Sequence, residues 1–357
     1  MGVERAYLNF EPRGKNQLIN NFDDLLNLIK IRLNKSSFWT TLNFATEIAL
    51  IIDHSIKTFE HPNNVIRRLN IINERLDLIE QFENENYFVN NHIKGSKINK
   101  DNYWDIAKKG FNFMWPKTTD EAIDFSESCK MALERFEQIL KISTKDYSEI
   151  KSFLDIGCGP GRYLYAAENL IKKVKLTGID TGKSILDKNR ERAELCRVEF
   201  ILDDVCCEKL DGKYSMVMCN GVAHHTGVPL NKVIKRHSEL VEDGGLYFIF
   251  VYGSGGFELK SWRFLQETVG LYPKEAVFNF WSSMINPLRV QGLMDHTYGV
   301  FYETTREEIE SELKNNFSNL KRVEGIYGLD VTEEIYSNDN FFDVKCGTGN
   351  LRYLAVK

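Results

Sequence analysis

A glycine-rich segment in the middle of the chain has the residue spacing that points most clearly to chemistry. Residues 155–161, with the sequence DIGCGPG, place Gly157, Gly159 and Gly161 directly after the apolar run SFLDI. Glycine lets the backbone turn tightly and approach a ligand closely, and the free amides at a helix start favour an anionic or polar group. The segment therefore predicts a strand, a ligand-binding turn and a helix, and it indicates a nucleotide-like cofactor.

Acidic residues follow the next two apolar runs. Asp180 ends the run LTGID, and Asp203 and Asp204 follow VEFIL. In a doubly wound fold these strand ends meet at the ligand-binding edge, where Asp180 would accept hydrogen bonds from both ribose hydroxyls. We expect Asp204, with Asp203 as the alternative, to accept from the exocyclic amine of a base. The competing interpretation is that these acids are helix N-caps.

Together, these residues resemble the class I S-adenosylmethionine-dependent methyltransferase family, whose glycine loop is preceded by an acid, as Asp155 precedes it here. The resemblance covers roughly residues 152–252 and includes the segment CNGVAHHT at 219–226. It implies that S-adenosylmethionine is the cofactor and S-adenosylhomocysteine the product. The cofactor-binding residues that it implies are Asp155, Gly157, Gly159, Gly161, Asp180, Asp204, Val205 and Asn220.

The pattern of apolar residues, which indicates the elements that position these residues, changes near residue 150. After it, short apolar runs alternate with helical stretches, which indicates strands of a parallel sheet. The family resemblance implies an α/β fold with a doubly wound, mostly parallel seven-stranded sheet. The expected strands are SFLDIG, KLTGID, VEFIL, YSMVMC and LYFIFVY, followed by residues 320–327 and 351–356.

Apolar residues recur at helical spacing before residue 150. The expected helices cover residues 17–35, 37–59, 63–85 and about 119–140. We predict an all-helical N-terminal domain over residues 1–118 that caps the site and recognises substrate. A methyltransferase domain over 119–357 would follow, with a substrate-side insertion at about 253–303. The segment Tyr252–Gly256 would be a flexible hinge for a substrate lid or an ordinary loop. The aromatic residues Trp104, Phe113 and Trp115 would close over the site or pack between the domains.

Catalysis of methyl transfer depends mainly on in-line alignment and exclusion of water. A hydroxyl or protonated amine acceptor also requires a base, and the pKa of histidine suits that role near neutrality. His225 is the first candidate and His296, in an expected polar loop over 295–298, the second; structural packing is the alternative for His224 or His225. An anionic acceptor needs no base, and the sequence leaves open whether oxygen, nitrogen or carbon is methylated. Cys158 is expected in an exposed position of the glycine loop, without a nucleophilic role.

Composition narrows the class of acceptor. The formal net charge is −5 and no block of Lys or Arg marks a nucleic-acid footprint, so a small-molecule acceptor is favoured. The seven cysteines include no CxxC pair, which argues against disulfides and a metal site and favours the cytoplasm. No apolar run of about 18 residues indicates a membrane span.

Other functions remain as alternatives to a small-molecule methyltransferase. One is a methyltransferase acting on RNA or protein, and another is a noncatalytic S-adenosylmethionine-binding protein. A dinucleotide oxidoreductase would carry G-x-G-x-x-G, whereas the third glycine here comes one residue early. The oligomeric state stays open, with a homo-oligomer among the options.

Overall fold

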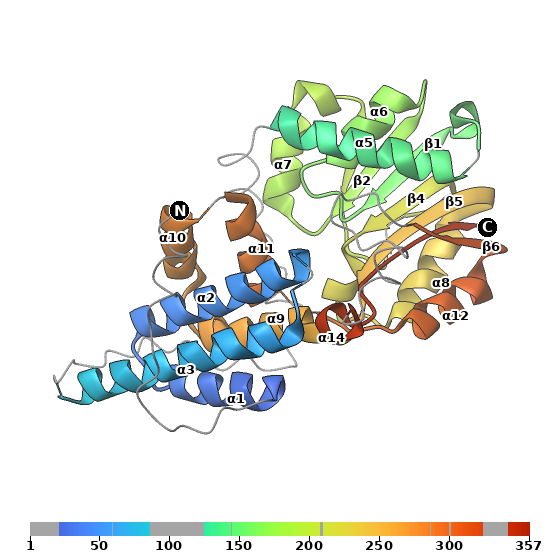
Figure 1. Cartoon of the computed structure of the whole chain (residues 1–357). Helices are drawn as coiled ribbons and strands as arrows, with labels where there is room; N and C mark the ends of the chain where they lie inside the picture. Colours follow the sequence, from blue (N-terminus) through green and yellow to red (C-terminus); the bar gives the residue numbers. More distant parts are fainter. Residues whose placement is uncertain are drawn as a thin grey trace. The chain divides into compact units, whose positions relative to one another are not determined.

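The computed structural model describes most of the chain (Figure 1). The described residues are 21–58, 60–85, 125–143, 145–207, 210–285, 287–299, 301–323 and 342–357. Within these ranges, no helix is both long enough and apolar enough to cross a bilayer.

Two compact units are distinguished by their internal contacts. They comprise Met1–Ser96 with Lys260–Pro273, and Lys97–Leu259 with Lys274–Lys357. The division falls inside helix α9 (Gly256–Thr268). The boundary predicted at residue 118 lies outside the described residues, as do Trp104, Phe113 and Trp115. The domain limits from sequence therefore stay a prediction.

The first unit is helical, as the sequence predicts. Its long helices are α1 (Phe22–Leu33), α2 (Phe38–Lys57) and α3 (Pro62–Glu85). Helix α1 begins where the Asn21 side chain accepts hydrogen bonds from two backbone amides of the first turn. Fully buried aliphatic residues at helical spacing line the three helices, namely Leu25, Ile29, Leu33, Leu42, Ile48, Val65, Leu69, Ile72 and Leu76.

The second unit contains a seven-stranded sheet with the order β3-β2-β1-β4-β5-β7-β6. Strands β1 to β5 run parallel, whereas β7 pairs antiparallel with both β5 and β6. The strands are β1 (Ser152–Ile156), β2 (Lys175–Asp180), β3 (Val198–Leu202), β4 (Tyr214–Asn220), β5 (Val241–Tyr252), β6 (Asn319–Arg322) and β7 (Asn350–Val356). The predicted doubly wound, mostly parallel sheet is confirmed, although residues 324–327 of the predicted sixth strand lie outside the described residues.

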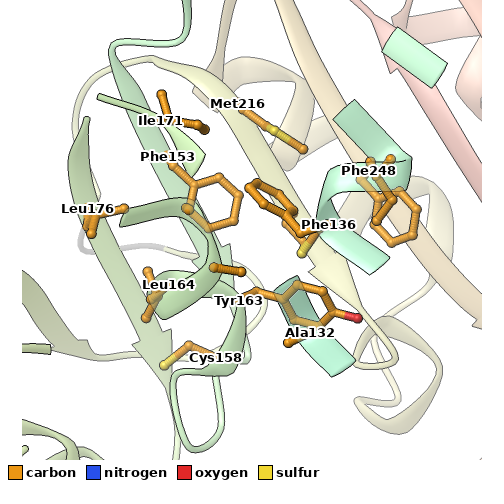
Figure 2. Packing of buried hydrophobic residues seen from close by; sticks show 14 of the residues in the cluster. Ala132, Phe136, Phe153, Cys158, Tyr163, Leu164, Ile171, Leu176, Met216 and Phe248 are labelled. Atoms are coloured by element: carbon orange, nitrogen blue, oxygen red, sulfur yellow. The ribbon is translucent and has the colours of Figure 1, made fainter. Parts of the chain in front are cut away.

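Helices cover both faces of this sheet (Figure 1). Along each strand, alternate residues enter opposite cores, as Phe153 and Leu154 do on β1. One face carries α5 (Phe125–Ser143), α6 (Arg162–Leu170) and α7 (Lys183–Glu191), and the other carries α8 (Leu230–Leu240) and α12 (Arg306–Asn316). Figure 2 shows Phe136 of α5 beside Phe153, with ring centroids 5.2 Å apart. Because β1, β2, β3 and β4 are parallel, packing of the two cores places their carboxyl ends along the same edge of the sheet.

One local expectation from the sequence is wrong. Asp295 to Tyr298 are the last turn of helix α11 (Pro287–Tyr298), which follows α10 (Lys274–Met284), and are not a polar loop. The segment after Tyr252, predicted to be a hinge or an ordinary loop, makes backbone hydrogen bonds: the Gly253 amide donates to Gly349 O at 2.8 Å and the Ser254 amide to Thr304 O at 2.9 Å. Glycine in this segment serves close backbone packing.

Candidate functional site

The glycine loop folds back onto the end of β2. The backbone amides of Gly157 and Cys158 both donate to Ile179 O at 2.8 Å, and the Gly161 amide donates to Cys158 O at 2.9 Å. All three glycines have positive φ values, 71° at Gly157, 50° at Gly159 and 83° at Gly161. These left-handed conformations explain the glycine pattern, because other residues adopt them at a cost. The Cys158 side chain is buried, and not exposed as the sequence suggested.

Only one of the three loop glycines faces open space. A methyl group added at Gly157 would overlap the Val222 side chain, and one at Gly161 would lie 2.6 Å from Leu195 Cδ1. One added at Gly159 would meet no atom of the described residues within 4 Å. The loop therefore leaves a cradle at Gly159 that a ligand can enter.

Alanine substitutions should separate the two kinds of glycine. Gly157→Ala combines a left-handed φ with the Val222 overlap, so we expect a fall in melting temperature of at least about 4 °C. Gly159→Ala carries only the conformational cost of about 1–2 kcal/mol, yet should weaken cofactor binding because its methyl group enters the cradle. Thermal unfolding and calorimetric titration of both variants check this. Equal melting temperatures would contradict the packing role of Gly157.

Asp180 ties the end of β2 to the glycine loop. Its Oδ2 accepts from the Gly159 amide at 2.9 Å, and its Oδ1 accepts from the Gly182 amide at 2.7 Å. Burial raises the pKa of the carboxyl despite these hydrogen bonds. Each carboxylate oxygen has a further lone pair, so the rigidly held group can accept two more hydrogen bonds from a ligand diol.

Asp155, near the end of β1, is a buried acid beside a second one. Burial and the negative charge of Asp180 raise its pKa to about 7, while Arg162 acts in the opposite direction. Such an acid gains most from a ligand that brings positive charge. The two acids predicted from sequence are thus brought together at the loop.

The acidic turn after β3 lies beside Asp180. The Asp203 amide donates to Asp180 O at 3.2 Å, and Asp204 Oδ1 accepts from the Cys206 amide at 2.8 Å. Asp204 therefore caps its own turn with one oxygen, and no helix begins at this turn in the described residues. Its other oxygen accepts no hydrogen bond from the described residues. The neighbouring Val205 is buried.

Residues far away in sequence hold these loops, and the sequence interpretation missed them. The fully buried His237 bridges Val205 O at 2.8 Å and Tyr247 Oη at 2.9 Å. Burial lowers its pKa to about 4, so it is a neutral structural group. On the other side, the buried Asn189 donates to Gly159 O at 2.8 Å. For both His237 and Asn189, the only indication in the sequence is a polar residue on an otherwise apolar helix face.

Histidines and aromatic rings gather beyond the end of β4. Asn220 ends the strand, Gly221 turns the chain with φ at 75°, and the 3-10 helix η4 (Ala223–His225) follows. The ring centroid of His225 lies 4.1 Å from that of His224 and 4.9 Å from that of Phe301. The cluster consists of His224, His225, Tyr252, His296 and Phe301.

The proton positions differ among these histidines. His224 Nδ1 accepts from the Tyr252 amide at 3.4 Å, so the proton of a neutral ring is on Nε2. Burial and the neighbouring His225 and His296 hold the pKa of His224 well below its usual range. Burial and His225 lower the pKa of His296 to about 3. His224 is therefore a hydrogen-bond donor and His296 a weak base.

A pocket of about 290 Å³ adjoins this cluster. It includes residues that follow the carboxyl end of β4, Val251 near the end of β5, and residues of the first turns of α12. Its lining residues are Ala223, His224, Val228, Pro229, Leu230, Asn231, Val251, Tyr302, Glu303, Thr304, Glu308 and Glu312. An apolar wall with a few polar groups is typical of small-ligand sites.

Residues 153–245 match a family model described as a methyltransferase domain. The match begins in β1 and ends in β5, so it covers the glycine loop, Asp180, Asp204 and Asn220. No curated protein matches the chain.

Solved structures resemble the chain at low identity. An O-methyltransferase family protein from Burkholderia thailandensis is 14% identical over 61% of this chain, which spans about half of that protein (55%), with a TM-score of 0.38. Magnesium protoporphyrin IX methyltransferase from Synechocystis PCC 6803 with bound S-adenosylhomocysteine is 14% identical over 71% of this chain and 99% of its own (TM-score 0.44). The 1,6-didemethyltoxoflavin-N1-methyltransferase of Burkholderia thailandensis is 14% identical, and the alignment covers 76% of this chain and 98% of that protein, with a TM-score of 0.42.

Proposed function

Since residues 153–245 match a methyltransferase domain, we propose that the chain is a class I S-adenosylmethionine-dependent methyltransferase that methylates a small-molecule acceptor. The observation that carries the acceptor class is the pocket beside the histidine cluster. Its volume of about 290 Å³ suits a metabolite-sized group, and no Lys or Arg of the described residues lines it. Three carboxylates in the lining would repel a nucleic-acid backbone, which argues against an RNA substrate.

The residues at the glycine loop fit S-adenosylmethionine. The open cradle at Gly159 leaves room for close approach of a ligand, and the carboxylate of Asp180 has lone pairs left for the ribose hydroxyls. Asp204 has an oxygen left for the adenine amine. We therefore assign the cofactor to Asp155, Gly157, Gly159, Gly161, Asp180, Asp204, Val205 and Asn220. The bound cofactor supplies a methyl group on positively charged sulfur.

The rest of the reaction depends on what this chain does to the acceptor. The aromatic cluster around His225 excludes water from the acceptor side, which keeps the attacking atom unsolvated. When that atom is a hydroxyl oxygen or an ammonium nitrogen, we assign His225 as the base that takes its proton on an imidazole nitrogen. His296 is the second candidate, weakened by its low pKa of about 3.

Cofactor binding should depend on pH through Asp155. Its pKa of about 7 means that the carboxyl is protonated in the free protein below pH 7. A cationic ligand favours the ionised form, so binding releases a proton and affinity rises with pH from 6 to 7, by at most about tenfold per unit. Above about pH 8 the affinity should level off. Calorimetric titration at several pH values measures this.

Asp155→Asn serves as the control, because it keeps the shape and removes the titrating group. Its affinity should stay nearly constant over the same pH range. S-adenosylhomocysteine, which lacks the sulfonium charge, should show a weaker dependence with the natural protein. An affinity for S-adenosylmethionine that is the same at pH 6 and pH 8 would remove Asp155 from the site.

The acceptor class is tested by transfer of a radiolabelled methyl group. Purified protein is incubated with labelled S-adenosylmethionine and, in separate reactions, with metabolite fractions, total RNA and a protein extract. We expect label in the metabolite fractions. Label in RNA or protein alone would overturn the small-molecule proposal, and cofactor binding without transfer to any fraction would favour a noncatalytic role.

A further inference from the structure

The acceptor pocket carries a strong excess of negative charge for its size. Glu303, Glu308 and Glu312 line it, and none of the described Lys or Arg residues does. The lining also includes the apolar side chains of Val228, Leu230 and Val251. Apolar walls strengthen the field of the carboxylates, because they replace water around them. The negative charge of these carboxylates therefore acts strongly on a ligand bound in the pocket.

The three glutamates have different roles. Glu308 completes a capping box at the start of α12: its Oε2 accepts from the Thr305 amide at 2.8 Å, and its own amide donates to Thr305 Oγ1 at 3.2 Å. Glu312, one turn later and half-buried, has no ion pair or side-chain hydrogen bond to any described residue. Helix stability accounts for Glu308, but it does not account for Glu312.

His224 provides an independent sign of a ligand in the same pocket. The ring lines the pocket and is only 3% exposed. Because the Tyr252 amide donates to Nδ1, the proton is on Nε2, and this nitrogen has no acceptor among the described residues. A buried donor without an acceptor costs about 1–3 kcal/mol. A ligand oxygen or nitrogen would supply the missing partner.

We propose that this pocket takes a methyl acceptor that carries a cationic amine. Glu312 holds the ammonium group, and His224 donates its Nε2 proton to a lone pair elsewhere on the same molecule. The ammonium group is an anchor, distinct from the atom that is methylated. This inference rests on the proposed function, because it identifies the pocket as the acceptor site.

The test compares three small probes of similar size that differ in charge. They are 2-phenylethylamine, 2-phenylethanol and 3-phenylpropionate, titrated by NMR into the full chain saturated with S-adenosylhomocysteine. We expect the amine to bind at least about tenfold more tightly than the other two, because it forms charge-assisted hydrogen bonds with carboxylates. Its affinity should fall as salt is added.

Two Glu→Gln substitutions in α12, one inside the pocket and one outside it, test which carboxylate binds the ammonium group. Glu312→Gln should lower the affinity for 2-phenylethylamine about tenfold, close to that for 2-phenylethanol. Glu307→Gln makes the same change of charge on α12 at an exposed residue outside the pocket, and should leave the affinity unchanged. Equal losses in both variants would mean a general charge effect and overturn the inference. So would tighter binding of the alcohol or the acid, or no binding of the amine at about 10 mM.

Imidazole nitrogen shifts test the role of His224 separately. Long-range proton–nitrogen spectra should show the Nε2-protonated form, with the Nε2 signal moving on addition of the amine. The Nδ1-protonated form would remove the second contact. Failure of this inference is distinct from failure of the proposed function: S-adenosylhomocysteine binding and methyl transfer are measured on the same protein. If both are present and the acceptors are neutral or anionic, only the cation site is wrong.

Discussion

Replacing Asp180 by alanine should weaken the binding of S-adenosylmethionine about 100-fold, the largest effect that we expect on cofactor affinity. The carboxylate is aimed by the amides of Gly159 and Gly182 and can accept from two ribose hydroxyls. Hydrogen bonds to a charged group are worth about 1.5–3 kcal/mol each, so losing two costs about 3 kcal/mol, or about 100-fold. Calorimetric titration measures the loss directly.

Asp203→Ala is the matched control for this substitution. Asp203 lies beside Asp180, since its amide donates to Asp180 O, but its side chain accepts from the Asp204 amide at 2.9 Å. We expect less than about a fivefold change in affinity, about 1 kcal/mol. Melting temperatures of both variants show whether the fold survives. Equal affinities of Asp180→Ala and Asp203→Ala in folded protein would refute the ribose assignment.

Replacing His225 by glutamine should lower methyl transfer at least about 100-fold when the acceptor needs deprotonation, the usual contribution of a general base. Glutamine approximates the volume of the ring, so the contacts with Phe301 and Tyr252 suffer less than with alanine. Cofactor affinity should change less than twofold, because His225 is not among the assigned cofactor residues. Steady-state kinetics and calorimetry of the same samples separate the two effects.

The pH profile distinguishes a base from a packing residue at this position. With the natural protein, kcat/KM should rise with pH as the base loses its proton, and this limb should vanish in His225→Gln. His296→Gln, at a residue that is already neutral because its pKa is about 3, should keep the profile and most of the turnover. Unchanged turnover of His225→Gln across pH would remove His225 as the base.

Local sequence patterns are sufficient to predict the part of the site that is formed by the backbone of the glycine loop. Gly157, Gly159 and Gly161 all adopt positive φ, so their residue type reports their conformation directly. Asp180 ends its strand and contacts the loop as the register of parallel strands requires. The seven-stranded sheet came from the family resemblance, since periodicity does not specify strand order, and the antiparallel direction of β7 was not predicted.

Helix α11 shows a sequence signal that was overlooked. The polar and aromatic residues of segment 295–298 predict a loop. Yet Val290, Leu293, Met294 and Thr297 follow helical spacing, and all four are buried. The apolar face of the preceding residues predicts the helix, whereas the polar residues at its end do not.

Other parts of the site depend on contacts that no local pattern contains. Asn189 meets Gly159 across 30 residues, and His237 meets Val205 across 32. Glu312 joins the pocket only because α12 packs beside α8 on the sheet. Cys158 lies in a loop by sequence but is buried, because the loop folds back onto Ile179. Tertiary packing decides each of these positions.

The most direct test of the central claim is calorimetric titration of the purified protein with S-adenosylmethionine, S-adenosylhomocysteine and NAD. The glycine loop with Asp180 and Asp204 predicts micromolar binding of the first two, about −8 kcal/mol, and no binding of NAD. Binding of NAD alone, or of none of the three, would contradict the account.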